Sequence, residues 1–223
     1  MPRRFPAILF YLAPGLLVVV GVLVWGRQIK RPVHHIPAWE GTWVEPGAQY
    51  PSFKSWRQEP DGTFVGECQN WPHKDRRADA YLRSAAGYAG DLTVELDAVF
   101  QRGRYLGCYL LYDPVFGNGY WLSTGHAVGE HPDEAYIKVV EDDKWTTLAR
   151  AKVPLEPGKS HHLAYRRQGD SLTVLIDGVP VVTARDSRFS TGKVQLRLHN
   201  TTVAIKNLTV TGTLAEPAGA AGN

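Results

Sequence analysis

The C-terminal part of the chain, residues 171–212, alternates apolar and polar residues in three runs. A period of two places every second side chain on the same face of a strand, so each run predicts a strand with one face on a core. Asp177-Gly178 separates two strand-like runs and is a strong hairpin signal, because both residues tolerate positive φ. The stretch therefore predicts a hairpin followed by two further strands. The apolar positions are Leu172, Val174 and Ile176, then Val194, Leu196 and Leu198, then Val203, Ile205, Leu208 and Val210.

Similar short segments fill the chain from Tyr50 onward, separated by Gly, Pro and Asp. Hardly any stretch in this part has the 3.6-residue periodicity of a helix. Many short strands with such turns favour an all-β fold, an antiparallel β-sandwich of jelly-roll type that spans residues 52–212. Earlier strands are expected at residues 53–57, 63–69, 80–84, 91–101, 105–112, 120–124, 135–141, 146–151 and 160–167.

The order of these elements resembles the C-terminal end of concanavalin-A-like jelly rolls. Ile176-Asp177-Gly178 is similar to a hairpin of this group, and Lys206-Asn207-Leu208 is similar to its closing strand. Laminin-G-like domains and 3-keto-disaccharide-hydrolase-type domains are the most similar, and the resemblance extends from Trp39 to Gly212. It implies the architecture but no single function, because this fold hosts lectins, glycosidases and adhesion modules.

A possible catalytic motif lies at Glu95 and Asp97. Retaining family-16 glycoside hydrolases of this fold use E-x-D-x-x-E on a strand, and these two acids match its first two positions. The last position, which supplies the acid/base in that family, is Phe100 here. A phenyl ring cannot protonate a leaving group, so retaining hydrolysis lacks its second carboxyl group. We therefore expect Glu95 and Asp97 to be the solvent-facing half of a strand.

The segment from Phe5 to Trp25 contains no charged residue. As a helix it would be about 31 Å long at about 1.5 Å per residue, which matches a bilayer core of about 30 Å. Residues 1–27 are therefore predicted to form one N-terminal transmembrane helix that is not cleaved. A short N-terminal tail before a long domain favours export, so we expect the sandwich to be extracytoplasmic, in the periplasm.

The segments on either side of the sandwich are rich in turn-forming or small residues. Residues 28–51 are predicted to form a Pro- and Trp-rich tether. In it Trp39 and Trp43 contact either the membrane interface or the sandwich. Residues 213–223 are small and polar and are expected to form a flexible tail.

The net charge of +3 and the absence of long Lys/Arg runs argue against a nucleic-acid partner. Cys68 and Cys108 are the only cysteines, and both fall in expected strands. They either pair as a disulfide in an exported domain or serve as small core residues. Glu141-Asp142-Asp143 forms either a calcium edge or a charged hairpin turn, and we expect the turn. No metal or cofactor is expected.

Aromatic residues mark the expected binding surface. Phe116 lies among turn formers between two strands, and an apolar residue at a loop tip often contacts a partner. Trp39, Trp43, Phe116, Tyr120 and Trp121 are therefore the candidate partner-binding residues.

Taken together, these features predict a membrane-anchored, non-catalytic β-sandwich. It would act as an accessory or scaffolding subunit that docks on partner proteins of a larger membrane complex, such as a photosynthetic one. One alternative is a carbohydrate-binding surface protein whose exposed Trp or Tyr side chains stack on sugar rings. The other is an enzyme related to glycoside hydrolases.

Overall fold

Strands form where the sequence alternates, and they make up most of the structure. The computed structural model describes residues 33–35, 39–41, 54–68, 79–125, 133–153 and 155–215. This part of the chain contains fourteen strands and no helix, which confirms the all-β class. The strands are β1 Val33–His35, β2 Trp39–Gly41, β3 Lys54–Gln58, β4 Phe64–Cys68, β5 Asp79–Arg102, β6 Leu106–Tyr112, β7 Gly119–Thr124, β8 Glu134–Glu141, β9 Lys144–Lys152, β10 Ser160–Gln168, β11 Ser171–Ile176, β12 Val179–Arg185, β13 Thr191–His199 and β14 Thr201–Leu214.

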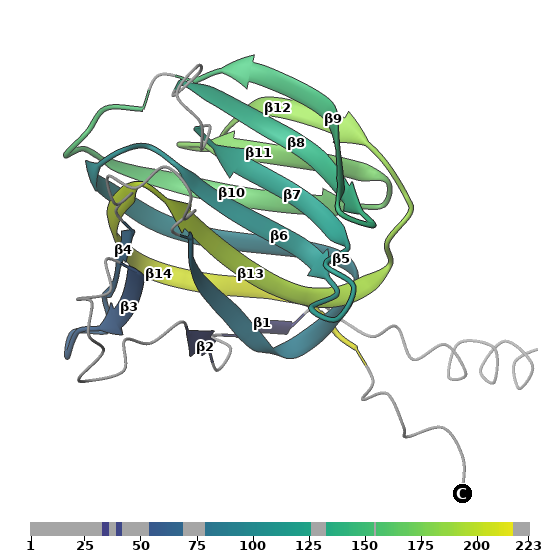
Figure 1. Ribbon diagram of the computed structural model, residues 1–223, viewed down its shortest axis with the longest axis horizontal. Helices are drawn as coiled ribbons and strands as arrows, with labels where there is room; N and C mark the ends of the chain where they lie inside the picture. The colour runs from purple at the N-terminus through teal and green to yellow at the C-terminus, as the bar shows by residue number, and fades with distance from the viewer. Residues whose placement is uncertain are drawn as a thin grey trace, which may run out of the picture. The chain divides into compact units, whose positions relative to one another are not determined.

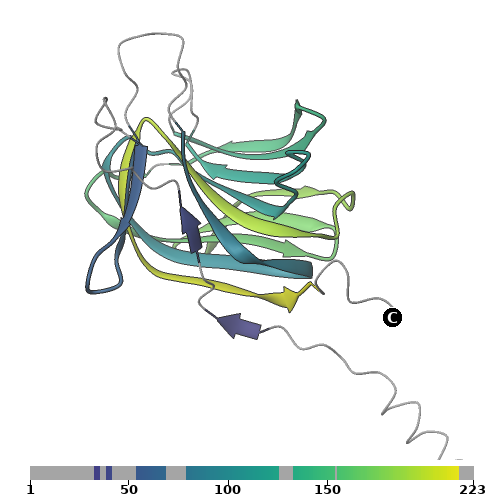
Figure 2. The same cartoon turned by 60° about the horizontal axis from the view of Figure 1, so that its bottom comes forward.

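The strands form two antiparallel layers that share β5. The first sheet has the order β12-β11-β10-β5-β14, with β4 and β3 beyond β14 and β1 also on β14. The second sheet has the order β5-β13-β6-β7-β8-β9, with β2 on the other edge of β5. Figure 2 shows β5 and β14 side by side in the first sheet. The predicted jelly-roll sandwich is thus confirmed.

Strand β5 is one continuous element where the sequence predicted two strands. Its first half pairs with β13 up to Ala89, and its second half pairs with β10 from Leu92 to Val99. Between them Gly90 has φ 71°, a left-handed conformation that glycine adopts without strain. The chain therefore turns from one layer into the other without leaving the ladder, as seen at the lower right of Figure 1.

Inward-facing residues of the two sheets form one core. Leu96 of β5 and Leu196 of β13 are fully buried, and burial of each such side chain stabilises the fold by about 1.5–3 kcal/mol. Tyr165 of β10 crosses the core and donates a hydrogen bond from its hydroxyl to the Leu106 carbonyl of β6 (3.0 Å). This bond satisfies the phenol, whose pKa burial raises far above its ordinary value.

Two hairpin turns follow directly from the sequence. Asp177 and Gly178, both at positive φ, connect β11 to β12 as predicted. Asp142 and Asp143 have φ of 51° and 60° and connect β8 to β9. Both central residues of this second turn are left-handed, as in a type I′ turn.

The segments around the sandwich differ from the sequence prediction. The tether contains β1 and β2, which pair with β14 and β5. Strand β14 continues to Leu214, two residues into the predicted tail, because Thr213 and Leu214 pair with β5. In both places the backbone N–H and C=O groups of a sheet edge pair with a segment whose local sequence does not predict a strand.

Cys68 and Cys108 are not joined by a disulfide. Cys68 lies on β4 of the first sheet and Cys108 on β6 of the second, and both side chains are fully buried in the core. Burial raises the pKa of the Cys108 thiol well above its ordinary value. The alternative of small core residues therefore holds, and the disulfide does not.

The described residues include no helix long and apolar enough to cross a bilayer. The apolar segment from Phe5 to Trp25 lies outside the described residues, so the membrane anchor stays a prediction.

Candidate functional site

The outer side of the second sheet gathers aromatic and cationic side chains. Tyr105, Tyr109, Trp121 and Val140 form a hydrophobic cluster separate from the core, with Tyr112 packed against it. Tyr109 and Trp121 each lie between two core residues of their strands and therefore point away from the core. We call this surface the aromatic face, and it comprises Tyr81, Arg83, Tyr105, Tyr109, Tyr112, Trp121, Lys138, Trp145 and Arg197.

A glycine makes room for the central ring of this face. A Cβ at Gly107 of β6 would lie only 1.7 Å from the Cη2 atom of Trp121. The indole therefore lies against the bare backbone of the neighbouring strand. Tyr109 and Tyr105 flank it, with centroid distances of 4.5 and 5.8 Å, and Trp121 is only 2% exposed. This ring is the floor of the aromatic face.

Trp145 of β9 is the exposed ring of the face. Its side chain is 44% exposed, whereas most large apolar side chains of the sandwich are buried. The ring lies 5.8 Å from Trp121 and 6.2 Å from Tyr109, in edge-on contacts that fix its position. An exposed aromatic ring held rigidly in this way can receive a flat apolar surface of a ligand.

Three cations are interleaved with the rings. The Arg197 guanidinium lies 5.5 Å from the Trp121 centroid, 5.8 Å from that of Trp145 and 5.9 Å from that of Tyr81. Lys138 Nζ lies 4.9 Å from the Tyr136 centroid and 6.0 Å from that of Trp145. All five distances are within the range of cation–π attraction, about 6 Å.

The third cation, Arg83, lies at the β5 side of the face. It lies 5.5 Å from the Tyr112 centroid, and its Nε donates a hydrogen bond to Gln195 Oε1 (2.7 Å).

Partial burial lowers the pKa of Lys138, since desolvation disfavours its charged form. The cations are thus placed to donate hydrogen bonds to a ligand that rests on the rings.

Glu95 and Asp97 do not face this surface. They point outward from the first sheet, where His162 Nδ1 donates to Asp97 Oδ1 (2.9 Å) and Asn207 Nδ2 donates to Asp97 Oδ2 (2.6 Å). These two hydrogen bonds lower the pKa of the Asp97 carboxyl. Phe100 is buried in the core. The expectation that both acids form the solvent-facing half of a strand agrees with this arrangement.

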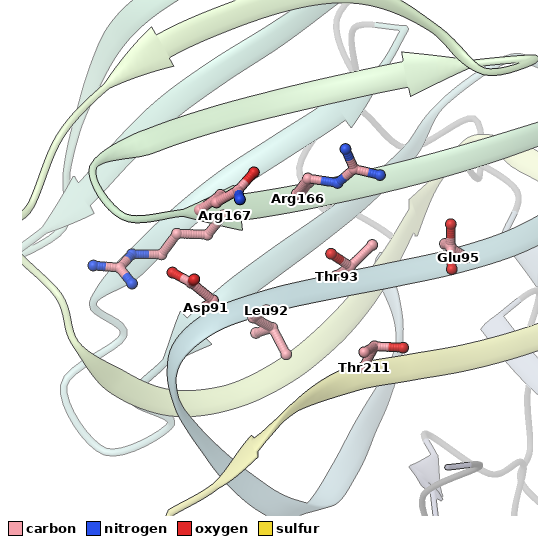
Figure 3. A pocket seen from close by; sticks show the side chains of 8 residues that line it. Asp91, Leu92, Thr93, Glu95, Arg166, Arg167 and Thr211 are labelled. Carbon is pink, nitrogen blue, oxygen red and sulfur yellow. The ribbon is translucent and has the colours of Figure 1, made fainter. Parts of the chain in front are cut away.

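A shallow depression of about 400 Å³ lies on the same outer side of the first sheet. Figure 3 shows Thr93 and Glu95 of β5 between Arg166 of β10 and Thr211 of β14. No aromatic ring lines it. A sugar ring placed here would find hydrogen-bonding groups but no surface to stack on, so the aromatic face is the stronger candidate. The lining residues are Asp91, Leu92, Thr93, Glu95, Arg166, Arg167, Gln168 and Thr211.

Only one of the five predicted contact residues belongs to the aromatic face, namely Trp121. Its neighbour Tyr120 points into the core, where its hydroxyl donates to Asp186 Oδ1 (3.0 Å). Trp39 is half-buried and packs against the core, and Trp43 lies outside the described residues.

Phe116 is 69% exposed at the tip of the loop between β6 and β7, as predicted for a loop-tip residue. The Asp113 carboxylate organises this loop by accepting hydrogen bonds from the backbone N–H groups of Val115 and Phe116.

Tyr81, Lys138, Trp145 and Arg197 were not singled out from the sequence. The signal that could have found Tyr81, Lys138 and Arg197 is the apolar alternation, since each of the three lies between two core residues of its strand. Trp145 lies between the exposed residues Lys144 and Thr146, so alternation gives no such signal for it. Which of these outward residues gather depends on strand order, and local pattern does not give that order.

Comparisons with known proteins agree with the fold. No family model matches the chain. The chain is 28% identical over 152 residues to a levanase of Bacillus subtilis, which covers 67% of this chain and 22% of the levanase. It thus spans about a fifth of that enzyme's length.

Solved structures give the same picture over most of the chain. The carbohydrate binding module CBM66 from Bacillus subtilis has a TM-score of 0.60 and 23% identity, covering 79% of this chain and 96% of the module. The Bacillus licheniformis β-glucanase has a TM-score of 0.57 and 12% identity, covering 83% of this chain and 99% of the glucanase. The chain therefore has the concanavalin-A-like jelly-roll fold, which occurs in binding modules and in hydrolases.

These comparisons contradict the prediction of an accessory subunit of a membrane complex. The matches that span most of the sandwich are to a levanase, a carbohydrate binding module and a glucanase. The prediction relied on the apolar N-terminal segment, the aromatic tether and the missing acid/base residue, and none of these identifies a protein partner. The carbohydrate-binding alternative fits the comparisons better.

Proposed function

We propose that the chain is a non-catalytic carbohydrate-binding domain and that the aromatic face binds the glycan. The observation behind this is Trp145, an exposed ring held by Trp121 and Tyr109 and flanked by Lys138 and Arg197. Sugar rings present flat C–H faces and a rim of hydroxyl groups. A fixed aromatic ring with hydrogen-bond donors beside it complements both features.

The similarity to a carbohydrate binding module and to a stretch of a levanase supports the same proposal. This support concerns the class of ligand and not a particular sugar, since the same fold occurs in a glucanase.

The distribution of acids argues for binding without hydrolysis. Glycoside hydrolysis uses two carboxyl groups on either side of the scissile bond, separated by about 5–9.5 Å. Strands β13, β6 and β7, which form the middle of the second sheet, contain no aspartate or glutamate. Glu95 and Asp97 point outward from the other sheet. A hydrolase acting on the aromatic face would lack its catalytic pair there.

The proposal is tested by affinity electrophoresis and calorimetry of the full chain against a panel of neutral and acidic polysaccharides. We expect binding to at least one polysaccharide, and we expect Trp145→Ala to weaken it about 30-fold, because truncating a central Trp contact costs about 2 kcal/mol. Phe116→Ala, which removes an exposed ring from the loop tip, is the matched control and should leave the affinity unchanged. A panel without any binder, or equal losses for both variants, would contradict the proposal.

The apolar segment from Phe5 to Trp25 would hold such a domain at a membrane surface, with the sandwich outside the cytoplasm. This placement stays a prediction, and carbonate extraction of membranes from cells that express the full chain would test it.

A further inference from the structure

The loop between β6 and β7 holds two adjacent apolar side chains in solvent. Val115 is 80% exposed and Phe116 is 69% exposed, which makes them the two most exposed large apolar side chains of the described residues. Such exposure is unfavourable in water, and paired apolar side chains at a loop tip are typical of a contact surface. The full set of exposed large apolar residues in this part of the chain is Val115, Phe116, Trp145, Val179 and Leu214.

Hydrogen bonds hold this tip in one conformation. The Asp113 carboxylate accepts bonds from the backbone N–H groups of Val115 and Phe116 (2.8 and 3.3 Å). The Asp113 N–H donates to the Asn118 carbonyl (2.8 Å), which closes the loop. The side-chain oxygen of Asn118 in turn accepts a bond from the Asp142 N–H of the β8–β9 turn (2.9 Å). A tip that is already ordered loses little conformational entropy when it meets a partner.

Strand register places the tip at the end of the sandwich where the N-terminal part of the chain enters it. The loop follows Tyr112 of β6, and the partner strand β13 begins opposite Ala89 of β5. Strand β1 begins at Val33 opposite Gly212 of β14, and the next residue of β14 also pairs with Ala89. The tip and the start of β1 therefore lie at the same end, where β5 passes from one sheet to the other.

Other exposed apolar side chains gather at this end. Leu214 is the last residue of β14, and Trp145 lies next to the β8–β9 turn that bonds to the loop. Val179 lies at the opposite end, because it follows the far end of β11. Strand β11 starts near the bend of β5, where the Gly169 N–H donates to Asp91 Oδ1 (2.7 Å). Four of the five exposed large apolar side chains of the described residues thus lie at one end.

The sequence before β1 indicates what this end meets. The uncharged segment from Phe5 to Trp25 is separated from Val33 by the seven residues 26–32. An extended chain spans about 3.5 Å per residue, so Trp25 and Val33 are at most about 28 Å apart. A bilayer that the apolar segment enters would therefore lie close to the start of β1, at the end of the sandwich that carries the tip.

Charges around the tip favour a neutral lipid surface over an anionic one. Asp113 lies in the loop, and the neighbouring turn holds Asp142 and Asp143 beside Lys144. Arg188 of the adjacent β12–β13 connection forms ion pairs with an aspartate and a glutamate (3.0 and 3.4 Å). These residues give no net attraction to anionic headgroups, whereas insertion of apolar side chains needs none.

From the exposure, position and charge of this loop we infer that the Val115-Phe116 tip inserts into the boundary between the headgroups and the acyl chains of a zwitterionic bilayer. The tip is a second membrane contact besides the predicted N-terminal helix. Because that helix keeps the tip near the bilayer, even a weak insertion is populated. Two contacts hold the sandwich in one orientation, which a single flexible connection does not. This inference goes beyond carbohydrate binding and does not depend on it.

The test places a fluorescent label on the tip of the full chain in phosphatidylcholine vesicles. Val115→Cys carries a nitrobenzoxadiazole label and leaves Phe116 in place, and the native Cys68 and Cys108 are buried and should not react. The matched control is the same label on Val179→Cys at the opposite end. Phospholipids with a nitroxide high on the acyl chain should quench the tip label at least about threefold more than the control, since an inserted apolar surface lies about 5–10 Å deep.

Further variants assign the insertion to the ring. In the labelled Val115→Cys chain, Phe116→Ala should lower the ratio of inserted to free tip about tenfold, because it removes most of the apolar area. Phe116→Leu keeps an apolar side chain and should retain the insertion. Replacing part of the phosphatidylcholine by phosphatidylserine should not increase quenching. The thermal midpoint of each variant verifies that it is folded.

Each other outcome overturns the inference. Weak quenching of the tip label, equal quenching at both labelled positions, or quenching only with anionic lipid would do so. A blue-shifted tip label that lipid nitroxides do not quench would mean that a second copy of the chain covers the tip. Failure of the full chain to enter vesicles would overturn the inference together with the predicted anchor. Glycan binding is measured separately in solution, so the proposed function stands or fails independently.

Discussion

The outer sides of the two sheets arise from the same alternation but have different chemistry. On the first sheet, Asp97 accepts hydrogen bonds from His162 and Asn207, and ordinary polar side chains face solvent. On the second sheet, the outward positions hold rings such as Trp121 and Trp145. Alternation specifies which side chains leave the core. The residues at the outward positions decide whether that side is merely solvated or can bind a ligand.

The largest contrast concerns stability. Trp121→Ala should lower the free energy of unfolding by about 3–5 kcal/mol, because it empties the floor of the aromatic face in the way a core truncation does. Thr93→Ala on the outer side of the first sheet should change it by less than about 0.5 kcal/mol. Urea unfolding of both variants measures the difference. Similar small values would mean that the outer side of the second sheet is packed no better than that of the first.

A second contrast uses two glycines. Gly107→Ala should cost about 1–3 kcal/mol and weaken glycan binding, because its Cβ would overlap the Trp121 ring. Gly87→Ala on β5 places its Cβ at ordinary contact distances, 3.6 Å from Ala215 Cβ, and should be nearly neutral. Chemical denaturation and the binding assay would show whether stability and glycan binding depend on the space that Gly107 leaves for the Trp121 ring. A neutral Gly107→Ala would show that the ring can shift without loss.

The smallest effect belongs to the first sheet and depends on pH. Hydrogen bonds from His162 and Asn207 lower the folded-state pKa of Asp97, so its stabilising contribution is present above the unfolded pKa of about 4 and disappears as the pH falls through the folded value. Because the carboxyl is about one-third exposed, we expect at most about 1 kcal/mol.

Stability curves of the wild type and Asp97→Asn measure this contribution. The two proteins should differ at pH 7 and converge near pH 2. A difference that persists at low pH would mean that the carboxylate charge is not the source. Glycan binding at pH 7 should be the same for both proteins, because Asp97 lies on the other sheet.

Local sequence determined the strands, the hairpins and the fold class. The period-two alternation buried Val94 and Leu96 and left Glu95 and Asp97 outside, since successive side chains of a strand point to opposite faces. The Asp177-Gly178 turn formed because its residues accept the backbone conformation that a tight hairpin needs. These are properties of neighbouring residues, and they can be inferred without knowing which strands pair.

Only the tertiary structure decided where the candidate site lies. Tyr81, Trp145 and Arg197 lie far apart in sequence and meet because β5, β9 and β13 belong to one sheet. The tertiary structure also places Tyr120 in the core and Trp121 on the aromatic face, although the sequence analysis had grouped them as one binding surface. Strand order is fixed by long-range pairing and by the shared core, and a local pattern contains neither. The physical reason is that alternation says which way a side chain points but not which side chains lie beside it.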